Sequence, residues 1–193
     1  MRNTITTSIS LLAGILLLAG CGGQTDQTAQ NTTTGANTPT STSNAAGVNL
    51  PERTAPAKSL KLDNPCSIIT QQQQNEFGVN RTPQEETSNG KRGCKYERGD
   101  AGSNGGWYAF VAADPNRTAQ EFGASNTNVD VVDIGEYSAY QSDDGSACMI
   151  AVDVAESGSV FVNGITRLQE NRPDACPLFT KFAEAAVQNL ENT

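Results

Sequence analysis

The stretch that decides the fold is Ala147-Cys148-Met149-Ile150-Ala151-Val152-Asp153-Val154. From Cys148 onward, a cysteine, an isoleucine and two valines hold every second position. Such alternation predicts a β-strand with one buried face. The segment that begins at Cys94 has the same pattern, because Cys94 and Tyr96 alternate with Lys95 and Glu97. Each of these two cysteines therefore heads a predicted strand.

Working outward, the same reasoning predicts six strands, at about residues 93–98, 107–113, 129–134, 136–141, 147–154 and 159–167. The glycine-rich residues 99–106 join the first two strands, and Asp144-Gly145 and Ser157-Gly158 supply turns. Helices are expected at about residues 65–77, from Asp114-Pro115 onward, and in the last segment, where one stripe holds Leu178, Phe182, Ala185, Ala186 and Leu190. We therefore expect an α+β fold, a single domain whose antiparallel sheet of about five or six strands packs with N- and C-terminal helices.

The N-terminal segment has the pattern of a secretory signal with a lipidation site. Arg2 supplies a positive charge, Ile9 to Leu18 a short apolar core, and Ala19 and Gly20 the small residues before Cys21. The apolar core is shorter than the roughly 20 residues that span a bilayer. A plain secretory signal would leave Cys21 unexplained. We expect residues 1–20 to be a signal peptide and Cys21 to carry the lipid that anchors the protein to the outer face of the cell membrane.

Residues 21–59 are rich in Thr, Asn, Gln, Ser, Ala and Pro, and contain no aromatic residue. Such a composition cannot bury enough apolar surface to offset its ordering entropy. We expect a disordered stalk with an end-to-end distance on the order of 35 Å. Its threonine-rich tract suits either O-glycosylation or an unmodified spacer. All eleven aromatic residues lie beyond it, so the folded domain is expected at residues 60–193.

Four cysteines remain after Cys21, at positions 66, 94, 148 and 176. An even number in an exported chain predicts two disulfides, and four cysteines allow three connectivities. Asn64-Pro65-Cys66 and Asp174-Ala175-Cys176-Pro177 both resemble helix starts, whereas Cys94 and Cys148 begin strands. Joining like with like favours Cys66 with Cys176 and Cys94 with Cys148. The first pair would close a loop of about 110 residues, which stabilises by roughly 4 to 5 kcal/mol.

Four short motifs carry a resemblance to a known family. They are Asn64-Pro65-Cys66-Ser67-Ile68-Ile69, Gly93-Cys94-Lys95-Tyr96, Ala147-Cys148-Met149-Ile150-Ala151-Val152, and Asp174-Ala175-Cys176-Pro177 before an apolar helix. Together they resemble the actinobacterial lipoproteins of the domain of unknown function 3558, in which the aromatic residue after the second cysteine is more often Trp than Tyr. The resemblance covers the whole folded domain. It implies a cell-surface lipoprotein with paired cysteines, and it implies no activity.

Several kinds of catalytic site lack their residues. The chain has no histidine, which excludes Ser-His-Asp and Cys-His catalysis and histidine-bound metals. Disulfide formation removes the thiolates of the domain. No nucleotide-binding glycine motif is present. We therefore predict no catalytic residues, no cofactor and no metal.

Carboxylates remain as candidates for chemistry. They form a first group at Asp130, Asp133 and Glu136, a turn pair at Asp143 and Asp144, and a third group at Asp153 and Glu156. A glycosidase needs two carboxylates about 5 to 10 Å apart, and calcium needs several converging oxygens. Neither arrangement can be read from these spacings, so solvated turns and strand edges are the favoured interpretation.

The net charge and the positions of basic and aromatic residues limit the classes of ligand that the protein is expected to bind. The formal net charge is −8, and removal of residues 1–20, with Arg2 as their single charge, makes it −9. Nucleic acid and anionic headgroups are therefore unfavourable ligands. A local basic group is interpreted as a solvated face of the sheet; it consists of Lys91, Arg92, Lys95 and Arg98. A run of aromatic residues is interpreted as mainly core; it consists of Trp107, Tyr108 and Phe110.

Three hypotheses for function follow. The first is a membrane-anchored, non-catalytic binding or accessory module that contacts an envelope protein or glycan. The second is an envelope hydrolase that works through carboxylates in a groove of the sheet. The third is a carrier of lipids or other hydrophobic molecules between the sheet and helix layers. The anchor, the stalk and the missing catalytic groups favour the first.

Overall fold

One antiparallel sheet organises the molecule, and its strand order is β1-β2-β3-β7-β6-β5-β4. The structure is a computed structural model that describes residues 49–100, 104–167 and 175–193. The strands are β1 (Gln84–Ser88), β2 (Lys91–Arg98), β3 (Trp107–Asp114), β4 (Asp130–Ile134), β5 (Tyr137–Asp143), β6 (Ala147–Val152) and β7 (Ser159–Thr166). The α+β class, with a single antiparallel sheet and two disulfides, is confirmed.

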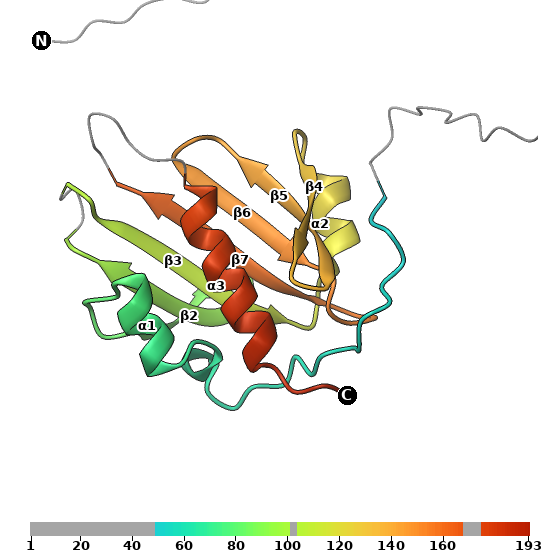
Figure 1. Ribbon diagram of the computed structural model, residues 1–193, viewed down its shortest axis with the longest axis horizontal. Helices are drawn as coiled ribbons and strands as arrows, with labels where there is room; N and C mark the ends of the chain where they lie inside the picture. Colours follow the sequence, from blue (N-terminus) through green and yellow to red (C-terminus); the bar gives the residue numbers. More distant parts are fainter. Residues whose placement is uncertain (1–48, 101–103, 168–174) are drawn as a thin grey trace, which may run out of the picture. The chain divides into compact units, whose positions relative to one another are not determined.

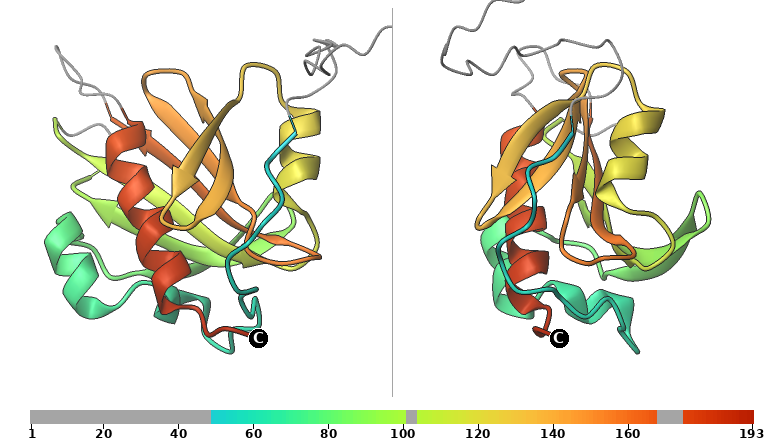
Figure 2. Two further views of the ribbon diagram at one scale, coloured as in Figure 1. Left: turned by 45° about the vertical axis from the view of Figure 1, so that its right-hand side comes forward. Right: turned by 90° about the vertical axis from the view of Figure 1, so that its right-hand side faces the viewer.

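Helices cover the two faces of the sheet unequally (Figures 1 and 2). The long helix α3 (Cys176–Asn189), the 3-10 turn η1 (Pro65–Ile68) and the short helix α1 (Gln71–Phe77) lie on one face. The helix α2 (Ala119–Ser125) lies on the other, over β5 and β6. The sheet therefore separates two apolar clusters, a large one under α3 and a smaller one under α2.

Aromatic rings fill the layer between α3 and the sheet. Phe182 packs against Trp107 with ring centroids 5.4 Å apart, and against Phe77 at 4.7 Å. Phe179 covers Gly164 of β7 so closely that a β-carbon at Gly164 would collide with its ring. The glycine thus lets α3 approach the centre of the sheet.

Two helices begin later than the sequence pattern predicts. Ile69 and Thr70 are extended, so the helix predicted at residues 65–77 is divided into η1 and α1, and Thr70 forms the capping box of α1. The helix predicted from Asp114-Pro115 instead starts at Ala119, after the capping box of Thr118. Asp114 ends β3, and its carboxylate is buried. A proline after an aspartate marked a turn here and not a helix start.

Among the described residues, the sheet has seven strands, one more than the upper figure that the sequence predicts. The missed strand is β1, whose sequence is Gln-Glu-Glu-Thr-Ser. It pairs with β2 at the edge of the sheet, and four of its five residues are exposed. With neither face buried against the core, the strand has no apolar alternation for a sequence pattern to detect.

The predicted disulfide pairing is wrong. The bonds join Cys66 to Cys94 and Cys148 to Cys176, each with a sequence separation of 28. Two strands lie between β2 and β6, which separates Cys94 from Cys148 by roughly 14 Å at the usual strand spacing, too far for a disulfide. Each bond instead fastens a helical start to the strand beneath it. A loop of this length stabilises by about 3.5 kcal/mol in the chain-entropy model.

The folded domain begins earlier than predicted. Residues 49–59, which we call the strap, bind across the domain although the sequence assigned them to the stalk. Tyr137 donates a hydrogen bond to the carbonyl of Pro56 at 2.6 Å, and the Lys58 amide donates to the Val154 carbonyl at 2.8 Å. Lys58 also forms a β-bridge with Asn192 beside the C-terminus.

The predicted signal peptide, the lipidation site Cys21 and the first part of the predicted stalk, up to residue 48, lie outside the described residues. Within the described ranges, no helix has the length and hydrophobicity needed to cross a membrane.

Candidate functional site

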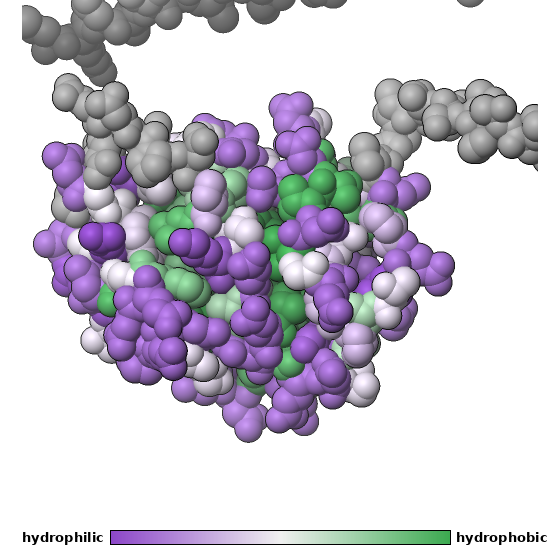
Figure 3. All heavy atoms as spheres, viewed as in Figure 1, coloured by the Kyte–Doolittle hydropathy of each residue, from purple (hydrophilic) through white to green (hydrophobic). Residues whose placement is uncertain are grey.

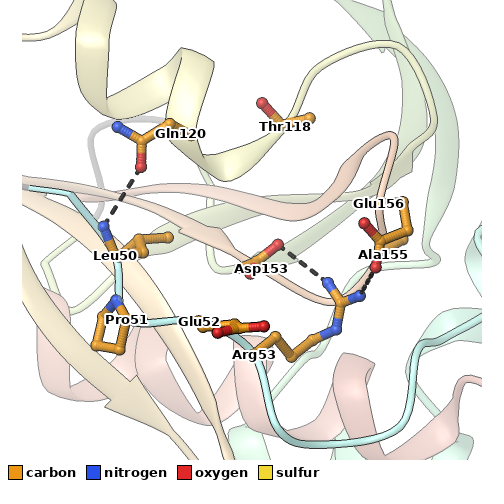
Figure 4. A pocket seen from close by; sticks show the side chains of 9 residues that line it. All are labelled: Leu50, Pro51, Glu52, Arg53, Thr118, Gln120, Asp153, Ala155 and Glu156. Atoms are coloured by element: carbon orange, nitrogen blue, oxygen red, sulfur yellow. Dashed lines mark hydrogen bonds and ion pairs between the residues drawn. The ribbon is translucent and has the colours of Figure 1, made fainter.

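The strap, the start of α2 and the segment after β6 enclose a pocket of about 360 Å³, which we call the strap pocket (Figure 4). Its volume is at the lower end of the range for small-molecule sites. The lining is mostly polar, and it comprises Leu50, Pro51, Glu52, Arg53, Thr118, Gln120, Asp153, Ala155 and Glu156. Two of the carboxylates predicted as candidates for chemistry, Asp153 and Glu156, are therefore in one site.

Arg53 joins these two carboxylates. Its guanidinium lies 3.3 Å from Asp153 Oδ1 and also donates to Glu156 Oε1 (Figure 4). The Arg53 side chain is 11% exposed, whereas that of Glu156 is 90% exposed. The contact with Asp153 is therefore the better shielded of the two, and the contact with Glu156 is screened by water.

The environment of Asp153 is set by the end of β6. Its backbone amide donates to the Ser138 carbonyl at 2.9 Å, which continues the pairing with β5 for one residue. Burial raises the pKa of the Asp153 carboxyl above its ordinary value, and the charge of Arg53 opposes this shift. Burial is the larger effect, so Asp153 holds its proton to a higher pH than a free aspartate.

Gln120 ties the strap to the sheet. Its side-chain oxygen accepts hydrogen bonds from the Leu50 amide at 3.3 Å and from the Tyr140 hydroxyl at 3.1 Å. Its side-chain nitrogen donates to Asn49 Oδ1 at 3.1 Å. The side-chain amide of one residue on α2 thus forms hydrogen bonds with both the strap and β5, and these bonds hold the wall of the pocket in place.

The arrangement suits recognition better than acid-base catalysis. Both carboxylates contact the same guanidinium, so neither stands free opposite a scissile bond. The described residues contain no group of three or more acidic, cysteine or histidine side chains that could hold a metal ion. The exposed carboxylate oxygens of Glu52 and Glu156 can instead accept hydrogen bonds from hydroxyl or amino groups of a ligand.

The other predicted acidic groups lie elsewhere. Asp130 and Asp133 are exposed on β4, and Glu136 is in the turn that follows. Asp143 and Asp144 stabilise the β5–β6 turn, because their side chains accept hydrogen bonds from backbone amides within it. The interpretation as turns and strand edges holds for both groups.

The basic group does not form one surface. Lys91 and Lys95 point to the face that carries α2, and Arg92 and Arg98 to the opposite face, as alternation along β2 requires. The interpretation as a solvated face is wrong for Lys91. Its side chain is buried, with the ammonium 3.4 Å from Asp114 and 5.1 Å from the ring centroid of Phe161.

The aromatic run is mainly core, as predicted. Trp107 is buried under α3, and Phe110 is buried in the cluster under α2. Tyr108, on the same face as Phe110, is partly exposed beside Arg167.

Sequence reasoning missed Arg53 and Gln120. The composition of residues 21–59 predicts that Arg53 belongs to the stalk, although Glu52 and Arg53 are the first charged residues after Asp26. The return of charge at that point was a usable signal for the start of the domain. Gln120 had no signal, because its role depends on the strap and β5 meeting over α2.

The sequence of this domain is similar to a known protein family. A family model, described as "Protein of unknown function (DUF3558)", matches residues 16–189. The chain belongs to the DUF3558 family. The match confirms the resemblance that the cysteine motifs indicate, and in this DUF3558 protein those motifs form the two bonds between helical starts and the sheet. No curated protein and no solved structure matches the chain.

Proposed function

We propose that this DUF3558 protein is a lipoprotein of the actinobacterial cell envelope that works as a non-catalytic binding or accessory module. The signal pattern and the Cys21 motif support a lipid anchor on the outer face of the membrane. The observation that carries the binding role is the bridge from Arg53 to both Asp153 and Glu156, since it engages the carboxylates that a hydrolase would need.

The ligand we propose is a polar envelope component, a glycan or a protein segment, that contacts the strap pocket. Glu52 and Glu156 are exposed there, and the Thr118 side chain also lines the pocket. Acceptor groups of this kind bind hydroxyl and amino groups. Residues 50–53 of the strap line the pocket, and along the sequence the strap follows the stalk that we expect after Cys21.

Photo-crosslinking in living cells tests the proposal. A photoreactive residue replaces Ala155 in the pocket, and the matched control replaces Ala124, which is exposed on α2 outside the pocket. We expect one dominant partner from position 155, absent from position 124 and lost when Cys21→Ala releases the protein from the membrane. The same scattered neighbours from both positions would contradict the proposal.

One observation favours a second function, a hydrolase that depends on carboxylates. The raised pKa of Asp153 is a property of general acids. If Asp153 donates a proton in catalysis, Asp153→Asn abolishes the hydrolysis of envelope glycans, whereas Asp63→Asn, which changes an exposed carboxylate outside the strap pocket, leaves it unchanged. Equal activity in both variants and the unmodified protein would exclude this role for Asp153.

A further inference from the structure

The strand β4 presents an open edge. It is last in the strand order and, within the part of the chain that the structure describes, pairs only with β5. Residues Gly135 and Glu136 form a two-residue turn between the paired residues Ile134 and Tyr137, and Gly135 has a φ of 61°. In such a hairpin the pair that closes the turn exchanges both backbone hydrogen bonds, and alternate pairs do the same. The amides and carbonyls of Val131 and Asp133 therefore point away from β5.

Nothing described occupies this edge. Among the backbone hydrogen bonds between described segments, none reaches Val131 or Asp133. Val131 is 37% exposed, and it is the one large hydrophobic side chain counted as exposed in the part of the chain that the structure describes. On the face that carries α3, Figure 3 shows hydrophobic side chains over β4 and in the band between β4 and α3.

The edge is strongly negative. Asp130 and Asp133 are exposed on β4, and Glu136 follows in the turn. Within the described ranges, none of the three forms a salt bridge. A second copy of this chain paired edge to edge would bring its own aspartates against these, which is unfavourable. A basic partner would be attracted.

A second cavity lies at the turn end of β4. It has a volume of about 440 Å³ and is lined by Lys58, Ile134, Gly135, Glu136, Tyr137, Glu184, Val187, Gln188 and Asn192. Ile134 and Val187 supply apolar walls, and Glu136 and Glu184 supply carboxylates. The Lys58 ammonium donates to the Leu190 carbonyl at 3.0 Å and is thereby engaged. An apolar wall with acidic groups suits the stem and charged head of a lysine or arginine.

We infer that the β4 edge binds an extended, basic segment of a partner protein as an eighth strand, with one of its lysine or arginine side chains in the adjacent cavity. Backbone hydrogen bonds to Val131 and Asp133 supply affinity, and the acidic side chains select the partner by charge. The inference rests on the proposed binding role, but it uses a surface separate from the strap pocket.

Synthetic peptides test the edge directly. The probes are two peptides of about eight residues, longer than an average strand, in which threonine alternates with lysine or with glutamate. The protein is the full chain with Cys21→Ala. With the lysine peptide we expect slower hydrogen exchange at the Val131 and Asp133 amides, measured by NMR. We expect no change with the glutamate peptide at concentrations up to about 1 mM, the weak end of specific binding.

Variants separate the backbone from the charge. Val131→Pro removes the outward amide at an edge position that tolerates proline, and we expect about tenfold weaker binding of the lysine peptide. Val131→Thr keeps the amide and is expected to bind normally. The double variant Asp130→Asn with Asp133→Asn is expected to bind the lysine peptide more weakly and with a smaller salt dependence. If Val131→Pro does not fold, this double variant tests the inference.

The outcomes are distinct. Equal binding of both peptides, or no protection of the two amides, overturns the inference. Binding of the lysine peptide that persists unchanged in both Val131→Pro and the double asparagine variant also overturns it. Protection at β4 together with scattered crosslinks from position 155 would keep the edge site and reject the strap pocket, so failure of either proposal is recognised separately.

Discussion

At the scale of single residues, Arg53 has the largest effect on the candidate site. Arg53→Met keeps much of the apolar stem but leaves the partly buried Asp153 without its cation. We expect the free energy of unfolding to fall by about 1–2 kcal/mol, because one of the two ion pairs is exposed and contributes little. Urea unfolding measures the loss, and limited proteolysis should show faster cleavage within residues 49–59. Arg81→Met is the control, because Arg81 lies on the exposed surface outside the strap.

Asp153 gives a prediction for pH. Since burial raises its folded pKa above the ordinary value of 3.8, the folded state binds the proton more tightly than the unfolded state. The contribution of Asp153 to stability is therefore fully present below about pH 3.8 and declines as pH rises through the folded pKa. Asp153→Asn should lack this decline. Unfolding free energies of both proteins between about pH 3 and pH 7 measure it, and parallel curves would contradict the assigned cause.

At the scale of elements, the contact between α3 and β7 depends on a missing side chain. Gly164→Ala places a methyl group against the Phe179 ring. We expect a loss of about 1–3 kcal/mol in unfolding free energy from overpacking. Asn163→Ala, one residue earlier and on the opposite face of β7, should change stability by no more than about 0.5 kcal/mol. Equal losses in the two variants would show that the loss in Gly164→Ala does not come from the close approach of α3 to β7.

The strands and helices differ in how well the sequence predicts them. Strand β6 is predictable because its larger apolar side chains, such as Ile150 and Val152, alternate along the chain and face the cluster under α3. The expectation of one buried face is wrong, because Ala151 on the other face is buried in the cluster under α2. The exposed strand β1 has no such alternation, and the division between η1 and α1 depends on the extended conformation of Ile69. The disulfide pairing was missed for a related reason. It depends on β3 and β7 lying between β2 and β6, and strand order is a property of the sheet and not of any one strand.

The site was less predictable than the fold. Asp153 and Glu156 were recognised as candidates, but the pocket forms only because the strap crosses over them. A contact between Arg53 and Asp153 spans 100 residues of sequence, and no local pattern encodes it. The exposed positions of Asp130 and Asp133 followed from surface preference alone.

At the scale of the whole molecule, the strap should behave as part of the domain. A chain that starts at Asn49 is expected to unfold with the same free energy as the full chain. A chain that starts at Leu60 loses the Arg53 ion pairs and the hydrogen bonds of Pro56, Ala57 and Lys58. We expect it to be less stable by about 3–5 kcal/mol. Equal stability of the two truncated chains would show that residues 49–59 do not stabilise the folded domain.

The two disulfides should contribute independently, because they close separate loops. Replacing Cys66 and Cys94 together with alanine is expected to lower the unfolding free energy by about 3–4 kcal/mol. The corresponding change at Cys148 and Cys176 should cost a similar amount. Urea unfolding of both variants, with the four-alanine chain for comparison, measures the two losses and their sum. A sum far from additive would mean that the bonds act through a shared part of the core.

The order of pairing has a consequence for how the chain matures. Of the four cysteines after Cys21, the first bonds to the second and the third to the fourth, so a chain that emerges from its N-terminus has both Cys66 and Cys94 available before Cys148 appears. Oxidation in order of emergence then yields the native bonds without reshuffling. We therefore expect a simple thiol oxidant to be sufficient for this chain, without a disulfide isomerase.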